Sequence, residues 1–285
     1  MRLCRFDDNR LGVVTGDVVR DVTAVIARLP AHRWPFPQGD SLIGALDELR
    51  PAIAEEAKRA PARPLAGAKL LSPVANPSKI VAAPVNYCRH LEEARADAQI
   101  HFQKQVEEIQ KIGLFLKATS ALAGPSEGVA LRHLDRRNDH EVELALVIGK
   151  RADRVRAADW ADYVAGYAIG LDMTIRGPEE RSLRKSVDSY CVVGPWLVTA
   201  DEIADPTRLT LSLAVNGEAR QNANTRDLVL GLGTLVELAS SFYTLLPGDI
   251  VLTGTPEGVG PVRPGDVMDA AIDGIGAMRV EVRAA

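Results

Sequence analysis

The chain has 285 residues, of which 46% are hydrophobic and 25% charged, and its formal net charge is −4. These values are typical of a globular protein, and no run approaches the roughly 20 apolar residues of a membrane-spanning helix. Lys and Arg form no basic patch, so we expect neither a nucleic-acid nor a membrane partner. The three scattered cysteines and the absence of a secretory signal predict a cytoplasmic protein.

The predicted elements begin with short strands in residues 1–25, joined by a turn at 16–18, and continue into a helix near 41–59. Several prolines then interrupt the chain. We therefore expect two units: a small N-terminal α+β domain over residues 1–72 and a larger catalytic domain over residues 73–285.

The larger unit is predicted to be mainly β after one long helix, which makes the fold class α+β. Cys88–Ile112 is rich in helix formers and ends before Gly113, a typical C-terminal cap, and Leu228–Phe242 predicts another helix. Alternating or β-branched runs between turn residues predict strands. These runs are 114–117, 140–149, 163–175, 194–199, 209–217, 249–254 and 278–283.

Three carboxylates stand in otherwise apolar strands. Glu141 and Glu143 are two residues apart, so both point to one face of a predicted strand, whereas His140 is out of phase with them. Burying two like charges is costly unless a cation neutralises them, and Asp172 adds a third carboxylate. An all-oxygen site suits Mg²⁺ or Mn²⁺. The alternative is a solvated strand end that binds no metal.

The same residues carry a resemblance. Glu141 and Glu143, followed by GYAIGLDMTIR with Asp172 and Arg176, resemble the metal-binding core of the fumarylacetoacetate hydrolase (FAH) family. Further segments similar to the family's motifs are NYCRHLEE (Asn86–Glu93), FLK (115–117), KSVDSYCVVGP (Lys185–Pro195), VNGEARQ (215–221) and TGTPEGVG (Thr253–Gly260). The resemblance implies a mixed β-sandwich roll, a homodimer, and metal ligation by the three carboxylates.

The resemblance also implies a catalytic group. His90 and Glu93 are three residues apart, so on a helix they share a face, and the carboxylate can orient the imidazole as a general base. The family places this pair on a lid over the metal. The alternative is an ordinary exposed helical pair. Lys185 is expected to stabilise an enolate formed on cleavage.

Four residues are expected to bind the substrate, a 2-oxo acid or diketo acid: Lys117, Arg176, Gln221 and Thr255. The departures from the family's common residues, Pro84, Val192 and the segment RGPEERSLRK (176–185), border the substrate pocket in this resemblance.

The predicted reaction is metal-dependent hydrolysis of a carbon–carbon bond in a β-diketo acid of the acylpyruvate or fumarylpyruvate type. Two alternatives keep the same metal site: decarboxylation of a 2-oxo acid, and isomerisation of a 2-hydroxymuconate-type dienol in aromatic catabolism. A third is a non-catalytic binding protein with the same fold.

Overall fold

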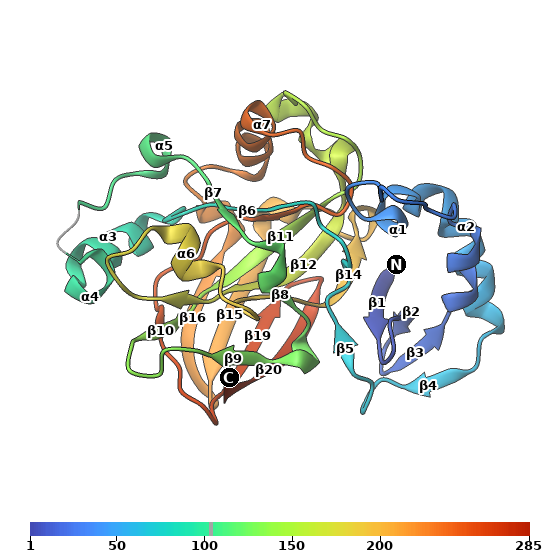
Figure 1. The fold of residues 1–285 in the computed structure, drawn as a ribbon, viewed down its shortest axis with the longest axis horizontal. Coiled ribbons are helices and arrows are strands. Elements are labelled where there is room, and N and C mark those ends of the chain that lie inside the picture. The colour runs from blue at the N-terminus through green and yellow to red at the C-terminus, as the bar shows by residue number, and fades with distance from the viewer. Residues whose placement is uncertain (103–104) are drawn as a thin grey trace.

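The structure, a computed structural model, describes residues 1–102 and 105–285, and its largest element is a 12-stranded mixed sheet (Figure 1). The strands, in spatial order, are β4 (Ala62–Pro64), β3 (Val18–Asp21), β2 (Arg10–Thr15), β1 (Arg2–Phe6), β14 (Cys191–Thr199), β12 (Val164–Asp172), β11 (Val142–Ile148), β17 (Ile250–Leu252), β6 (Ile80–Ala82) and β7 (Phe115–Lys117), with β5 (Leu70–Leu71) on β1 and β8 (Leu122–Ala123) on β14.

Two smaller sheets complete the β structure. The five-stranded sheet contains, in order, β16 (Glu218–Asn224), β15 (Thr210–Val215), β19 (Val267–Ile272), β20 (Gly276–Ala284) and β9 (Val129–Leu131). The three-stranded sheet contains β13 (Thr174–Ile175), β10 (Asn138–His140) and β18 (Gly260–Pro261). The sheet-dominated α+β fold predicted from the sequence is confirmed.

The helices are short and lie around the sheets. The α-helices are α1 (Ser41–Gly44), α2 (Leu46–Arg59), α3 (Cys88–Ala96), α4 (Ala98–His101), α5 (Ile109–Ile112), α6 (Arg181–Lys185) and α7 (Leu232–Phe242). The 3-10 helices are Thr23–Arg28, Thr119–Ala121, Pro125–Glu127, Ala157–Tyr163, Ala200–Glu202, Pro206–Arg208 and Thr225–Asp227.

The central strand β11 is buried on both faces. Val142 and Leu144 belong to a hydrophobic cluster that includes residues of the five-stranded sheet, such as Val280. Ala145 and Val147 point the other way, into a cluster with α1, α2 and β6. The alternation expected for a strand is therefore present, and it places Glu143, the polar residue of β11, on the same face as Ala145 and Val147.

The predicted division between residues 1–72 and 73–285 stays a prediction. Arg2 pairs with Val198 across β1 and β14, so the N-terminal strands extend the large sheet. Ile53 of α2 shares a hydrophobic cluster with Val147 of β11. The N-terminal part therefore contributes to one face of the central strands.

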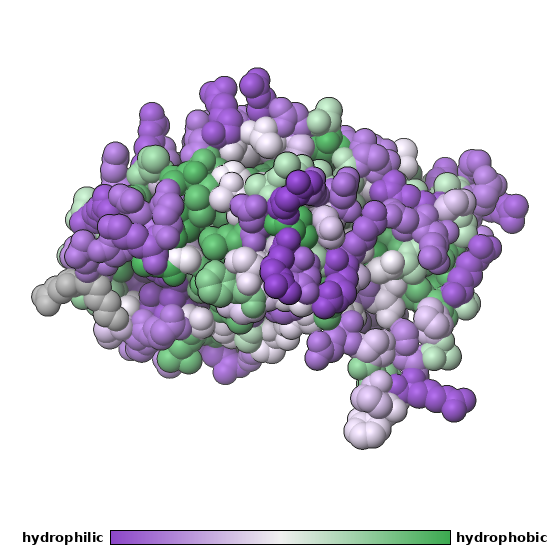
Figure 2. All heavy atoms as spheres, turned by 90° about the horizontal axis from the view of Figure 1, so that it is seen from above, coloured by the Kyte–Doolittle hydropathy of each residue, from purple (hydrophilic) through white to green (hydrophobic). Residues whose placement is uncertain are grey.

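No described helix is long and apolar enough to cross a membrane. Figure 2 shows one face of the molecule, on which hydrophilic side chains are interspersed with smaller apolar areas.

The single long helix predicted over Cys88–Ile112 is wrong. Asp97 leaves the helical conformation, with φ −93° and ψ 107°, and its carboxylate accepts from the Gln99 backbone N–H at 2.8 Å. It also pairs with Arg137 at 2.8 Å. Asp competes well for such capping positions, so the helix stops and restarts there. Residues 103–104, also within the predicted helix, lie outside the described residues.

The helix predicted from Leu228 begins four residues later than expected, because the backbone groups of the residues before it form hydrogen bonds with Asn86. The Val229 N–H donates to the Asn86 carbonyl at 2.9 Å, and the Leu230 N–H donates to Asn86 Oδ1 at 2.7 Å. Asn86 Nδ2 donates to the carbonyls of Leu230 and Thr253, at 2.9 and 2.8 Å. The buried amide thereby joins the start of α7 to the end of β17.

Substituting Asn86→Ala should lower the free energy of unfolding by about 3 kcal/mol, because the backbone groups it satisfies are left without partners. Urea unfolding monitored by circular dichroism measures this loss. The exposed Asn222→Ala serves as a matched control and should change stability by less than about 0.5 kcal/mol. Equal stability of the two variants would contradict the cross-linking role.

Candidate metal centre and active site

Three buried carboxylates meet where β11 and β12 lie side by side. Glu141 precedes β11, Glu143 lies within it, and Asp172 ends β12. The antiparallel register pairs Glu143 with Gly170, and the Asp172 N–H donates to the Glu141 carbonyl at 2.9 Å. One oxygen from each carboxylate lies within 4.8 Å of the others. The register of β11 and β12 therefore brings the three predicted ligands together.

The carboxylates differ in their electrostatic surroundings. Burial, reinforced by the nearby charges of Asp172 and Glu141, raises the pKa of Glu143 well above its usual range. Burial opposes ionisation of Glu141 too, but Lys185 and Arg176 outweigh it and hold the pKa of that carboxyl well below its usual range. Glu143 is therefore the member of the set with the least charge compensation.

A hard divalent cation fits this donor set, because all three side chains offer oxygen. The described residues provide no competing His or Cys cluster. His140 turns away from the carboxylates, as its register predicts, and contacts Gln221 instead. A bound cation would compensate the negative charge of Glu143, which contacts no Lys or Arg side chain among the described residues.

The TGTP segment (Thr253–Pro256) contacts Glu143, the carboxylate with the least charge compensation. The Gly254 N–H donates to Glu143 Oε2 at 2.6 Å. Gly254 has φ +99°, and a Cβ there would lie 2.6 Å from Asn86 Cβ. Both the conformation and the close approach require glycine at this position. The motif therefore supports a metal ligand rather than binding phosphate.

Lys117 lies against one of the predicted metal ligands, Asp172, and outside the lining of the pocket. Its side chain is fully buried on β7, and its ammonium donates to Asp172 Oδ1 and to the Lys185 carbonyl. It is not among the residues that line the pocket. Lys117 therefore holds Asp172, one of the predicted metal ligands, in position, and its role in substrate binding stays a prediction.

Lys185 lies at the end of α6 and faces the carboxylates. Its Nζ donates to Glu141 Oε2 and Asp172 Oδ2, both at 2.7 Å, and to Thr174 Oγ1 at 2.6 Å. Arg176 reinforces this side: its Nε donates to Asp139 at 2.7 Å and its Nη2 to Glu141 at 3.0 Å. Both cations line the pocket, so they are placed to meet a substrate beside the metal site.

His90 and Glu93 form the predicted pair on α3. His90 Nδ1 lies 2.8 Å from Glu93 Oε2, and Glu93 Oε1 accepts from the Gly258 N–H at 3.0 Å. Since the ionised carboxylate can only accept, Nδ1 carries the proton and Nε2 is left as a base. His90 is buried and lines the same pocket as Glu141 and Asp172.

Gln221 lies behind the pocket rather than in it. Its Oε1 accepts from the Val142 N–H at 3.0 Å, and its Nε2 donates to Thr255 Oγ1 at 2.8 Å. Thr255 Oγ1 in turn donates to the Val142 carbonyl at 2.9 Å. Thr255 lines the pocket, but its hydrogen is used, so it can offer a substrate only an acceptor. Neither side chain therefore has a free hydrogen to donate to a substrate, and their roles in substrate binding stay predictions.

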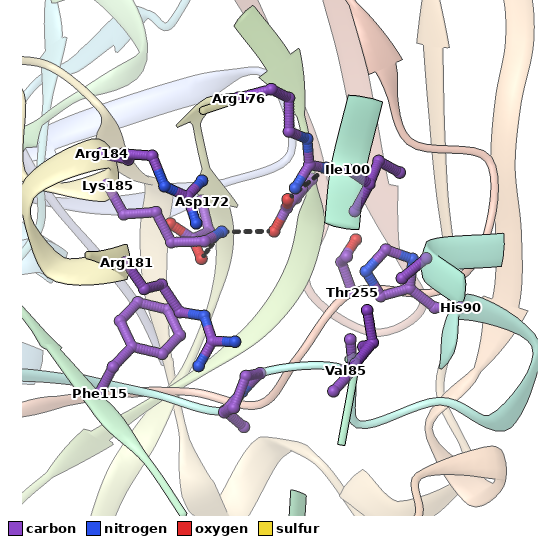
Figure 3. Close-up of a pocket in the computed structure, with 15 residues that line it drawn as sticks. Val85, His90, Ile100, Phe115, Asp172, Arg176, Arg181, Arg184, Lys185 and Thr255 are labelled. Atoms are coloured by element: carbon purple, nitrogen blue, oxygen red, sulfur yellow. Dashed lines mark hydrogen bonds and ion pairs between the residues drawn. The ribbon is translucent and has the colours of Figure 1, made fainter. Parts of the chain in front are cut away.

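Figure 3 shows these groups around one pocket, with Lys185 and Asp172 on one side, His90 and Thr255 on the other, and Arg176 between them. Ala83, Pro84, Val85, Ala94, Ile100, Val106 and Phe115 add an apolar lining. Two further residues line it that the sequence reasoning did not single out, Arg181 and Arg184. For Arg181 a signal was available: on a helix, a residue four positions before Lys185 shares its face.

The comparisons with known proteins decide the family. The pattern of the fumarylacetoacetate (FAA) hydrolase C-terminal family matches residues 79–283. The chain belongs to the FAH family. The maleylpyruvate hydrolase of Aquipseudomonas alcaligenes is 60% identical over 285 residues, covering 99% of each chain.

Solved structures of FAH-family relatives agree. The maleylpyruvate hydrolase from Sphingobium sp. SYK-6, in complex with manganese(II) and pyruvate, has a TM-score of 0.84 and 44% identity, covering 100% of this chain and 99% of that chain. Another structure of the same protein gives a TM-score of 0.85 with full coverage of both chains. The predicted family and its fold are confirmed.

Stability without metal should depend on pH through Glu143. Its folded pKa lies above the ordinary 4.5, so its contribution to stability is fully present below about pH 4.5 and is lost as pH rises toward the folded pKa. Without metal, wild type should therefore lose up to about 1.4 kcal/mol per pH unit more than Glu143→Gln in this window.

Thermal unfolding in EDTA between pH 5 and 8.5 checks this difference. Glu141 adds no slope there, because its lowered pKa confines its effect to more acidic solution. Adding Mn²⁺ should stabilise wild type and leave Glu143→Gln little changed. Parallel stability curves for the two proteins in EDTA would contradict the assignment.

Proposed function

We propose that this FAH-family protein hydrolyses the carbon–carbon bond of maleylpyruvate or a closely similar acylpyruvate, releasing pyruvate and a carboxylic acid. The observation that carries the proposal is one pocket lined by Glu141 and Asp172 of the three-carboxylate cluster and by His90, whose Nδ1 lies 2.8 Å from Glu93. A cation and a general base on opposite sides of one cavity suit attack by water on a chelated diketo acid.

The predicted enzyme class, a metal-dependent hydrolase of the acylpyruvate type, is confirmed by the 60% identical maleylpyruvate hydrolase and by the manganese–pyruvate complex of a relative. Choosing maleylpyruvate rests on the similarity across 99% of the chain, which includes the residues of the pocket.

When bound to Glu141, Glu143 and Asp172, a divalent cation would act as a Lewis acid toward the 2-oxo-acid end of the substrate. The side chains supply the rest. His90 Nε2, left unprotonated by the bond from Nδ1 to Glu93, takes a proton from water as its oxygen attacks the distal carbonyl carbon. The pocket's apolar lining limits access of other water.

Cleavage then breaks the bond between the attacked carbonyl carbon and the adjacent methylene. The acyl part leaves as a carboxylic acid, which releases the second proton of the water to solvent as it ionises, and the electron pair passes to pyruvate as its enolate. The Lys185 ammonium, beside Glu141 and Asp172, stabilises this negative charge. The proton held by His90 completes the balance when the enolate becomes pyruvate.

The first test follows loss of the maleylpyruvate enol absorbance with Mg²⁺, Mn²⁺ or EDTA. Wild type should turn over only with metal, and His90→Asn should lose at least about 100-fold in kcat because the base is gone. His133→Asn is a matched control: His133 is exposed, and its φ of +54° suits Asn. Metal-independent turnover, or full activity of His90→Asn, would contradict the mechanism.

Product analysis separates the reactions that share this site. Hydrolysis gives pyruvate and maleate, with one oxygen atom from labelled water in maleate. A decarboxylase would release carbon dioxide, and an isomerase would yield a product of unchanged mass. A metal-loaded protein that consumes no diketo acid would revive the non-catalytic alternative.

A second prediction concerns the proton on His90. In Glu93→Gln the amide oxygen should stay on the Gly258 N–H, so its NH₂ group faces His90 Nδ1. The imidazole must then carry its proton on Nε2, where it cannot act as a base. We expect a fall in kcat of about 100-fold with unchanged Mn²⁺ affinity.

Steady-state kinetics and Mn²⁺ titration measure both quantities. Glu92→Gln, the exposed neighbour on α3, is the matched control and should keep wild-type kcat. Activity of Glu93→Gln within a few-fold of wild type would show that Glu93 does not set the tautomer.

The choice of Mg²⁺ as the physiological ion, a homodimeric assembly and a cytoplasmic location complete the proposal. An oxygen-only donor set supports Mg²⁺ as well as Mn²⁺. Free cysteines support a reducing compartment. Sedimentation and metal analysis of the isolated protein test the first two points.

A further inference from the structure

The wall of the pocket formed by α6 and its flanking residues is strongly basic. Arg176, Arg181, Arg184 and Lys185 all line the cavity. Arg176, Lys185 and the neighbouring Lys117 already pair with the carboxylates of the cluster, so a bound divalent cation would leave this region with excess positive charge. A pocket of this kind suits a substrate with more than one negative charge.

Most of these cations are already engaged. Arg176 is bonded to Asp139 and Glu141, and Lys185 to Glu141 and Asp172. Arg184 donates from Nε to the Glu179 carbonyl and from Nη1 to the Ile175 carbonyl, both at 3.0 Å. These bonds fix the three side chains as parts of the protein framework.

Arg181 is the exception. Among residues 1–102 and 105–285, no hydrogen bond or ion pair joins its guanidinium to a protein acceptor; instead Cζ lies 5.5 Å from the centre of the Phe115 ring. Figure 3 shows the guanidinium extending from beside Phe115 into the pocket. A guanidinium has five N–H donors in a rigid fork, which matches a carboxylate.

The placement of Arg181 relative to the reacting end is also suitable. It begins α6 and Lys185 ends it, so the two residues lie one turn apart, about 6 Å along the helix axis. The Phe115 ring contacts both cations at 5.5 Å and presents an apolar surface between them. A substrate whose 2-oxo-acid end lies at Lys185 can therefore extend its acyl chain past Phe115 toward Arg181.

We propose that Arg181 binds the distal carboxylate of a dicarboxylic acylpyruvate and so selects acyl groups that carry a carboxylate over uncharged ones. This inference rests on the proposed function, since it names the substrate feature that the same site recognises. Arg181 acts in specificity and not in bond cleavage. Burial lowers the pKa of the Arg181 guanidinium, and a bound carboxylate would offset that cost of desolvation.

The experiment compares maleylpyruvate, which has the distal carboxylate, with acetylpyruvate, which lacks it. Arg181→Met should lose roughly 100-fold in kcat/KM for maleylpyruvate and less than about 3-fold for acetylpyruvate, because only the former loses a charged pair. Arg181→Lys should recover part of the loss. Arg59→Met on α2, exposed and outside the pocket, is the matched control for the change in net charge.

A binding measurement gives a second readout that needs no turnover of acetylpyruvate. The inhibition constant of maleate, the product with the distal carboxylate, should rise roughly 100-fold in Arg181→Met, whereas that of pyruvate should not change. Equal losses for both substrates, or an unchanged maleate constant, would overturn the inference. If wild type cleaves neither substrate, the proposed hydrolysis fails instead, which distinguishes the two outcomes.

Discussion

The site depends on placing three carboxylates together inside the protein. Glu141, Glu143 and Asp172 are all buried, and like charges at this separation repel strongly where water is excluded. The fold lowers this cost with buried cations. Lys185 contacts Glu141 and Asp172, and Lys117 contacts Asp172 from another side. Among the described residues Glu143 receives a backbone N–H but no cation contact, and this deficit favours binding of a metal over a closed salt-bridge network.

Much of this could be predicted from the sequence. Side-chain alternation placed Glu141 and Glu143 on one face, and the apolar surroundings of Asp172 marked it as a buried acid. The strands themselves followed from their composition. The sequence does not show which partner each polar group contacts. A buried lysine such as Lys117 has the same sequence context whether it contacts a substrate or Asp172. The same holds for Gln221, because its partners are distant in the chain.

The errors in the helices have a related origin. Composition favoured helix through Asp97 and from Leu228 onward, and local propensity is a weak guide where tertiary bonds compete. Asp97 is held by Arg137, and the residues before α7 are held by Asn86. In both places a polar side chain pairs with a charged group or a backbone group that would have no partner if the helix were continuous. These deviations lie around the pocket, where local rules are most often overridden.

The segment from Gly254 to Gly258 shows how one loop can align two chemical functions. Gly254 supports a metal ligand, Thr255 faces the pocket, and Gly258 orients Glu93, which in turn sets the proton on His90. One short loop therefore holds both a carboxylate of the predicted metal site and the carboxylate that orients the base. The TGTPEGVG motif is thus best understood as a shared backbone support, whose glycines permit approaches to Asn86 and Arg220 that a side chain would block.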